Sequence, residues 1–124
     1  MLFRSMVIAG DTLIVAESLG RRLTAFTIGD DGSLSNQRIW AELGTAVPDG
    51  IALTDDGQVW LADAGGPRCI RVREGGEVTA IATTSQPCYA CALDGDRLYA
   101  LTAASSLAVE ASVSRTGRVE VADL

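Results

Sequence analysis

The sequence contains no histidine, and its 124 residues carry only 10 basic side chains against 16 acidic ones, a net charge of −6. The missing histidine excludes catalysis and metal binding through an imidazole. The acidic balance lacks the basic footprint that sequence-independent binding to nucleic acid or to an anionic membrane needs. No apolar run approaches the roughly 20 residues that span a bilayer, and the first residues lack the pattern of a signal peptide. We therefore expect a cytoplasmic protein with no nucleic-acid or membrane partner.

Cysteine is also scarce, since Cys69, Cys88 and Cys91 are the only three. An odd number this small does not make a disulfide framework. The Cys88-x-x-Cys91 spacing fits a zinc or redox pair, but the sequence has no second pair and no histidine to complete a tetrahedral zinc site. On a regular strand, residues three positions apart point to opposite faces. Small buried thiols are therefore the expected role, with a metal or redox role as the alternative.

The residues that are abundant indicate an all-β chain. Apolar residues alternate over short stretches, β-branched residues are frequent, and 13 glycines accompany aspartate in the turns between stretches. Glycine, aspartate and asparagine tolerate the positive φ at which two strands reverse. The turn signals are Gly10-Asp11, Asp30-Asp31-Gly32, Asp55-Asp56-Gly57, Gly65-Gly66-Pro67, Glu74-Gly75-Gly76, Asp94-Gly95-Asp96 and Arg115-Thr116-Gly117.

These turns separate twelve candidate strands, which fall into three similar units. In the second unit the strands are expected at 50–53, 58–62, 69–72 and 77–82. The third unit aligns with the second at an offset of 39, and the first aligns at an offset of about 46. Four antiparallel strands in about 40 residues are typical of a β-propeller blade. The alternative is one twelve-stranded sandwich or barrel.

The propeller interpretation makes residues 1–124 a single half-propeller domain, with four-stranded blades at about 1–46, 47–85 and 86–124. The segment 118–124 would be the outer strand of the third blade. Closed propellers typically contain about four to eight blades, so three cannot close a ring. Two copies would supply six blades around a two-fold axis, which predicts a homodimer. A fragment that needs a separate N-terminal half is the other way to complete the ring.

Several runs of the sequence resemble the SMP-30/gluconolactonase/LRE family. The similar runs are Thr12-Leu13-Ile14-Val15-Ala16-Glu17-Ser18, Leu23-Thr24-Ala25-Phe26, Gly32-Ser33-Leu34-Ser35-Asn36-Gln37-Arg38, Pro48-Asp49-Gly50-Ile51-Ala52-Leu53 and Asp56-Gly57-Gln58-Val59-Trp60-Leu61-Ala62. The resemblance covers nearly the whole chain but only the C-terminal half of a family member. It implies a six-bladed propeller with a divalent metal, such as Ca²⁺, Zn²⁺ or Mg²⁺, in the central channel. It also implies hydrolysis of lactones or related esters.

The resemblance assigns one metal-ligand position to this chain. Family members are similar in holding the metal with a glutamate, an asparagine of an Asn-Gly motif and the aspartate of a Pro-Asp-Gly motif. Only the last is present, as Asp49, which is thus both the metal and the catalytic candidate. The Asn-Gly position aligns with Arg4-Ser5, and the blade that carries the glutamate is absent from the sequence. In a homodimer two Asp49 carboxylates with waters could hold a cation, or each Asp49 could pair with Arg4 without a metal. A turn residue is the third interpretation of Asp49.

Other residues have weaker signals. Glu17 and Asp63 occupy equivalent strand ends, where they either face the channel mouth together with Arg4 or are solvated. Trp60 and Tyr99 are expected to fill space between blades.

Three functional hypotheses follow. The first is a metal-dependent lactone or ester hydrolase that acts on a small lactone or sugar-acid ligand as a paired half-propeller. The others are a non-catalytic half-propeller that binds a small molecule or has a structural role, and a truncated fragment.

Overall fold

The computed structural model describes residues 3–104 and 116–124, which form eleven strands. No helix that could cross a membrane occurs in these two ranges. The strands are β1 (Phe3–Ala9), β2 (Thr12–Glu17), β3 (Arg22–Ile28), β4 (Leu34–Glu42), β5 (Pro48–Leu53), β6 (Val59–Asp63), β7 (Arg68–Val72), β8 (Val78–Thr83), β9 (Cys88–Asp94), β10 (Arg97–Thr102) and β11 (Arg118–Asp123). The expected all-β class is confirmed.

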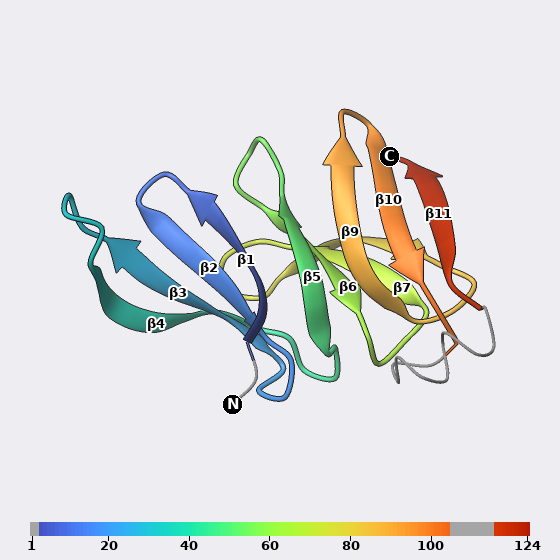
Figure 1. Cartoon of the computed structure of the whole chain (residues 1–124), viewed down its shortest axis with the longest axis horizontal. Helices are drawn as coiled ribbons and strands as arrows, with labels where there is room; N and C mark the ends of the chain where they lie inside the picture. The colour runs from blue at the N-terminus through green and yellow to red at the C-terminus, as the bar shows by residue number, and fades with distance from the viewer. Residues whose placement is uncertain (1–2, 105–115) are drawn as a thin grey trace.

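The strands form three antiparallel sheets that stand in a row (Figure 1). The first sheet has the order β1-β2-β3-β4, the second β5-β6-β7-β8 and the third β9-β10-β11. The first two sheets have the four strands expected of a blade. The segment 118–124, expected as the outer strand of a four-stranded third blade, forms β11 and pairs directly with β10. The third sheet therefore has three strands within the described residues, and the segment 105–115 lies outside them.

Glycine-containing turns set the register of the hairpins. The connections β1–β2 and β9–β10 are two-residue turns, Gly10-Asp11 and Gly95-Asp96, as the sequence predicts. The glycine has a φ of 61° in the first turn and 57° in the second. Residues that carry a Cβ atom rarely adopt this backbone conformation. The expected turn at 115–117 lies partly outside the described residues.

Each sheet packs face to face on the next sheet of the chain. We call the face that contacts the next sheet the forward face and the face that contacts the preceding sheet the rear face. The forward face of the first sheet, with Ile14 and Leu23, packs on the rear face of the second, with Leu61 and Ile70. The forward face of the second sheet (Trp60, Ala62, Cys69) packs on the rear face of the third (Cys88, Leu98, Ala100).

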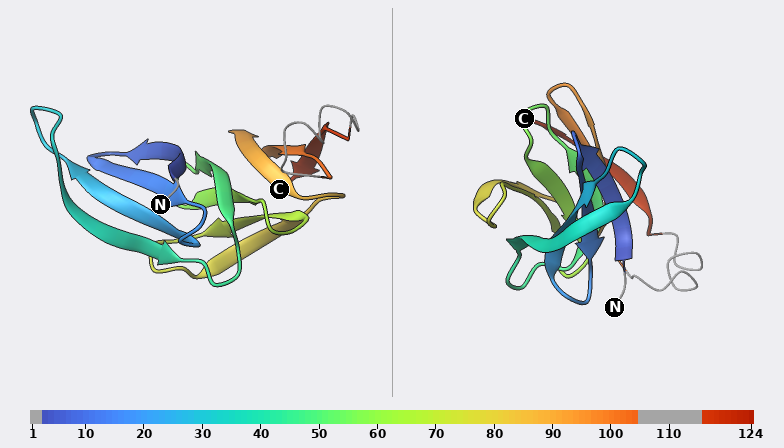
Figure 2. Two further views of the ribbon diagram at one scale, coloured as in Figure 1. Left: turned by 60° about the horizontal axis from the view of Figure 1, so that its bottom comes forward. Right: turned by 90° about the vertical axis from the view of Figure 1, so that its left-hand side faces the viewer.

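The first strands of the three sheets form the inner side of the row. β1 contacts β5, and β5 contacts β9, so the three strands lie side by side (Figure 2). Trp60 is 1% exposed in the second core and fills the space between two sheets, as expected. The guanidinium of Arg71 lies 5.7 Å from the centre of its rings. Tyr99, at the equivalent position, lies half-buried on the third sheet. This arrangement is that of consecutive propeller blades around a channel.

Candidate functional site

The three inner strands bulge at equivalent positions near their starts. The pairing register with the neighbouring strand skips Arg4 in β1, Asp49 and Gly50 in β5, and Tyr89 in β9. A bulge takes a residue out of the alternation of the sheet and re-aims its side chain. The bulges therefore gather Arg4 and Asp49 at one end of the inner strands, where a propeller has its channel.

The Asp49 carboxylate is the candidate reactive group of this site. It is half-buried, and the described residues make no hydrogen bond or ion pair with it. Burial raises the pKa of Asp49 above its ordinary value, and the positive charge of Arg4 lowers it in part. Asp49 and Arg4 thus influence each other electrostatically, although they form no ion pair. The carboxylate is free to bind a ligand or to accept a proton.

Ser5 and Gly50, which were not among the expected site residues, hold the bulges in place. The Ser5 hydroxyl oxygen accepts a hydrogen bond from the Ile51 backbone N–H, at 3.3 Å, and so links β1 to β5. Gly50 lies against β9: a Cβ on Gly50 would lie 2.6 Å from the Ala90 Cα atom and 3.0 Å from the Tyr89 carbonyl oxygen. The Pro-Asp-Gly motif is the sequence signal for Gly50, because it places a residue without a side chain directly after Asp49.

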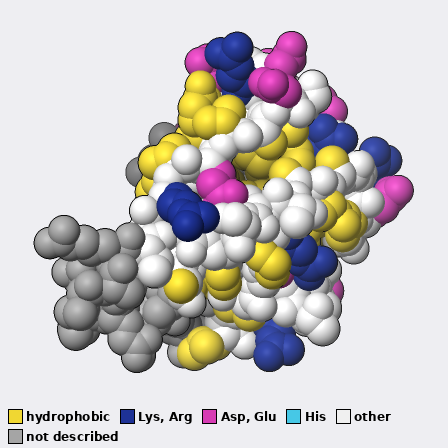
Figure 3. Space-filling model, turned by 90° about the vertical axis from the view of Figure 1, so that its right-hand side faces the viewer, with side chains coloured by type: hydrophobic (Ala, Val, Ile, Leu, Met, Phe, Trp, Pro, Cys, Tyr) yellow, Lys and Arg dark blue, Asp and Glu magenta, His cyan; other side chains and the backbone are white. Residues whose placement is uncertain are grey.

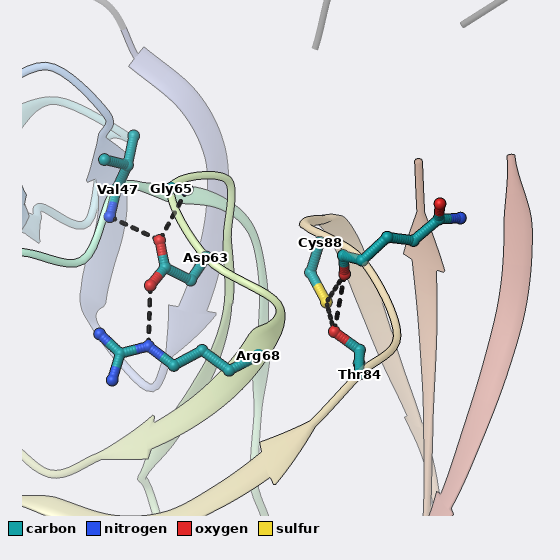
Figure 4. Close-up of polar contacts among 7 residues, drawn as sticks. Val47, Asp63, Gly65, Arg68, Thr84 and Cys88 are labelled. Atoms are coloured by element: carbon teal, nitrogen blue, oxygen red, sulfur yellow. Dashed lines mark hydrogen bonds and ion pairs between the residues drawn. The ribbon is translucent and has the colours of Figure 1, made fainter. Parts of the chain in front are cut away.

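Asp63, at the end of β6, is buried and saturated with donors. Its carboxylate accepts hydrogen bonds from the backbone N–H groups of Val47 at 3.0 Å and Gly65 at 2.8 Å, and from Arg68 Nε at 2.9 Å (Figure 4). Glu17, at the end of β2, pairs in the same way with Arg22. The expectation of a solvated strand end is wrong for both, since Glu17 is 1% and Asp63 2% exposed. For Asp63, the three donors compensate the desolvation of the buried charge.

In the third sheet, the corresponding carboxylate is Glu120, which lies on β11 instead of on the second strand of the sheet. Thr102 stands at the position of Asp63, and its hydroxyl donates to Glu120 of β11 at 2.6 Å. Glu120 also accepts from the Ser85 N–H at 2.9 Å and the Ser85 hydroxyl at 2.8 Å. The hydrogen bond from Thr102 lowers the pKa of Glu120. Every sheet thus has a carboxylate near the end of its second strand. Asp63 and Glu120 also accept hydrogen bonds from the segment just before the first strand of their sheet, from Val47 and Ser85 respectively.

Glu17 differs from the other two carboxylates in having an unsatisfied oxygen. Glu17 Oε1 is buried and has no hydrogen-bond partner among the described residues. Glu17 lines a pocket of about 410 Å³ on the rear face of the first sheet together with Arg22, Thr24, Gln37, Arg38 and Ile39. An unpaired buried carboxylate oxygen is unfavourable. The described residues of the rear face therefore provide no donor for this oxygen.

The three cysteines meet in the core between the second and third sheets. The bulge at Tyr89 places Cys88 opposite Thr102 and Cys91 opposite Ala100, so both thiols face this core. The expectation that they point to opposite faces is wrong, because it assumed a regular strand. The hydrogen bond with Cys88 lowers the pKa of the Cys69 thiol. The interaction with Cys91 and burial outweigh this effect and raise the pKa to about 12. The contact with Cys69 and burial raise the pKa of Cys88. The expected buried thiols are confirmed for Cys69 and Cys88.

The described residues of one chain do not make a complete metal site. Within residues 3–104 and 116–124, no three histidine, cysteine or acidic side chains are placed to hold an ion together. Asp49 is a single carboxylate with an arginine nearby, whereas Ca²⁺ takes about six to eight oxygen ligands. A divalent cation at Asp49 would need ligands from other blades.

Known structures with this fold extend beyond the present chain. A luciferin-regenerating enzyme matches 99% of the chain and 45% of its own length, with a TM-score of 0.83 and 21% identity. A gluconolactonase from Xanthomonas campestris matches 81% of the chain and 34% of its own, with a TM-score of 0.70 and 23% identity. Regucalcin from Agrobacterium tumefaciens, a calcium-binding protein, matches 98% and 46%, with a TM-score of 0.77 and 17% identity. The chain thus spans less than half the length of each.

These similarities establish the fold, and the family follows from the sequence itself. Residues 8–105 match the SMP-30/gluconolactonase/LRE-like region. This range includes the Pro-Asp-Gly motif with Asp49 and both buried strand-end carboxylates, Glu17 and Asp63. The resemblance expected from the motifs is confirmed: the chain belongs to the SMP-30/gluconolactonase/LRE-like family.

Proposed function

We propose that this chain is one half of a lactonase-like hydrolase and that Asp49 is its catalytic carboxylate. The observation that carries the proposal is the position of Asp49, which lies on a bulge of the inner strand β5 without a hydrogen-bond partner among the described residues. Membership of the family supports a lactone or a related ester as the substrate. The substrate would bind in the channel once three further blades complete it.

The chemistry requires a proton acceptor and a positive charge. A water molecule attacks the lactone carbonyl carbon and transfers a proton to the Asp49 carboxylate. The bond between this carbon and the ring oxygen breaks, and the alkoxide that leaves takes up the proton, which yields an open-chain hydroxy acid. Arg4 is the nearby cation that would stabilise the negative charge developing on the carbonyl oxygen.

A divalent cation is the second part of this proposal. Bound Ca²⁺, Mg²⁺ or Zn²⁺ would polarise the carbonyl group or acidify a water molecule. The family relation to a calcium-binding regucalcin supports such a cation. Because Asp49 is the one ligand candidate among the described residues, the remaining oxygen ligands would come from the other blades of the ring and from water.

Asp49→Asn is expected to lower the rate of aldonolactone hydrolysis at least about 100-fold, because an amide cannot accept the proton of the attacking water. The assay is proton release from gluconolactone, with and without added Ca²⁺, Mg²⁺ or Zn²⁺. The matched control is Asp55→Asn, which changes an exposed aspartate at the other end of β5 and should leave the rate unchanged. Full activity of Asp49→Asn, or an inactive wild-type protein under all these metal conditions, would contradict the proposal.

The same variant is expected to be more stable than the wild type at neutral pH. Burial raises the pKa of folded Asp49, so the folded state binds more protons than the unfolded state between the two pKa values. Wild-type stability should therefore fall as the pH rises through the folded pKa, and Asp49→Asn should lack this decrease. Thermal unfolding from pH 4 to 8 measures the difference. A Tm of Asp49→Asn below that of the wild type at pH 7 would show that the carboxylate is stabilised in the fold.

A non-catalytic half-propeller is the second candidate function. The observation in its favour is that residues 3–104 and 116–124 provide an incomplete ligand set, with one carboxylate and one arginine where a cation would bind. A ligand that binds only the folded state must raise the Tm. This candidate therefore predicts a folded protein whose Tm does not respond to Ca²⁺ or Zn²⁺ and which does not hydrolyse lactones. A rise in Tm with either ion that Asp49→Asn abolishes would exclude it.

A further inference from the structure

Two apolar sheet faces lack a partner within the described part of the chain. The rear face of the first sheet exposes Met6 (67%), Ile8 (61%) and Ile39 (55%). The forward face of the third sheet exposes Leu101 (51%), Val119 (64%) and Val121 (56%). Figure 3 views the third-sheet end of the molecule and shows hydrophobic side chains gathered there. Contiguous apolar patches of this kind mark interaction surfaces.

Cross-strand pairing makes each patch one continuous surface. In the third sheet Leu101 pairs with Val119, and Tyr99 pairs with Val121. In the first sheet Ile8 pairs with Leu13, which in turn pairs with Phe26. The surface on the first sheet therefore extends over three strands, and the surface on the third sheet extends over two.

The contacts within the chain indicate the kind of surface that each face fits. Twice along the chain the forward face of one sheet packs on the rear face of the next, and each contact buries a hydrophobic core. Within the described residues, nothing covers the forward face of the third sheet or the rear face of the first sheet. A second copy carries the complement of both. Three sheets from one copy are too few for a ring and nine from three copies are too many, whereas six from two copies lie within the range of about four to eight blades.

A buried charge on the rear face also points to a covering sheet. Glu17 is 1% exposed, yet its Oε1 has no donor among the described residues, and it lines the pocket on this face. In the second sheet the equivalent Asp63 lies on the face that the first sheet covers, and it is fully paired. The position is thus one that a neighbouring sheet normally encloses.

We propose that two copies of this chain close a six-bladed ring, in which the forward face of each third sheet packs on the rear face of the other copy's first sheet. The two contacts are identical and are related by a two-fold axis along the channel. In this ring, a second copy of the chain supplies the three further blades that the proposed hydrolase requires. The two Asp49 residues then lie around one channel. The inference rests on the sheet faces, while the hydrolase rests on Asp49.

The mass in solution tests the ring. Sedimentation velocity of the wild-type protein should give a dimer, twice the 12.9 kDa of one chain. The double variants Val119→Glu/Val121→Glu and Met6→Glu/Ile8→Glu should each be monomeric, because every contact would bury charges. Ile81→Glu is the matched control, since Ile81 is 58% exposed but lies at the outer edge of the second sheet, and it should remain dimeric. Thermal unfolding verifies that each variant folds.

Mixing the two double variants distinguishes this ring from other dimers. In a forward-to-rear ring, a heterodimer of the two variants carries both altered faces in one contact and leaves the other contact wild type, so dimers should reappear. A dimer built from two forward faces or two rear faces would contain an altered face in every heterodimer, and mixing would restore nothing. A wild-type monomer, a larger assembly, or no recovery on mixing would overturn the proposal. A wild-type dimer without lactone hydrolysis would overturn only the proposed function.

Discussion

Replacing Gly50 with alanine is expected to destabilise the protein by about 1–3 kcal/mol, the typical cost of inserting atoms where there is no space. The added Cβ would lie 2.6 Å from the Ala90 Cα atom, which is far inside van der Waals contact. The obstacle is backbone of β9 rather than the end of a flexible side chain, so β5 and β9 must move apart. Gly50 does not adopt a positive φ, so the close approach alone requires glycine here.

The separation of the two strands should also affect the site, because Gly50 follows Asp49 in the same bulge. Urea unfolding measures the loss of stability, and the lactone assay measures the displacement of the carboxylate. Gly117→Ala is the matched control, since a Cβ on Gly117 would have no described atom within 4 Å and Gly117 has no positive φ. Equal stability of Gly50→Ala and Gly117→Ala would show that the inner strands are not held in this contact.

Asp63→Ala is expected to lower the free energy of unfolding by about 3 kcal/mol or more, since it leaves buried donors without an acceptor. The Val47 and Gly65 N–H groups would each lose a hydrogen bond of 3.0 Å or less. Arg68 would lose its partner as well, but its side chain is 35% exposed and water can solvate part of it. Because Val47 directly precedes β5, the start of this strand should also become less firmly held in the folded state.

The appropriate comparison is an ion pair of the same chemistry at the surface. Asp123 lies 3.5 Å from Arg97, and both side chains are more than half exposed. Such pairs contribute little to stability, so Asp123→Ala should unfold at nearly the urea concentration of the wild type. If Asp63→Ala behaved like Asp123→Ala, the buried network at the end of β6 would not stabilise the fold.

The strand order and the blade pattern could be predicted because they depend on local chemistry. Gly10-Asp11 and Gly95-Asp96 tolerate the backbone of a tight turn, and alternation of apolar residues identifies strands of period two. The expected strands of the second unit agree with β5, β6, β7 and β8 within two residues at each end. The third sheet was expected to have four strands, and the described residues contain three.

The errors at the site have a common origin in the bulges and in burial. Alternation predicts opposite faces for Cys88 and Cys91, but one inserted residue, Tyr89, brings them to the same face. The strand-end position of Asp63 suggests solvent, yet the segment before β5 encloses it and supplies the Val47 N–H. A sequence pattern contains neither the register of a bulge nor the partner that a distant segment provides.

The sequence by itself determined the all-β class, the repeating units, the family and the choice of Asp49 as the candidate, because turn residues, apolar alternation and the Pro-Asp-Gly motif are local properties. Only the tertiary structure decided which faces are buried and which are open, that Gly50 must lack a side chain, and that Glu17 and Asp63 are buried ion-pair partners. These properties depend on contacts between residues far apart in the chain, and packing of one sheet on another is what brings such residues together.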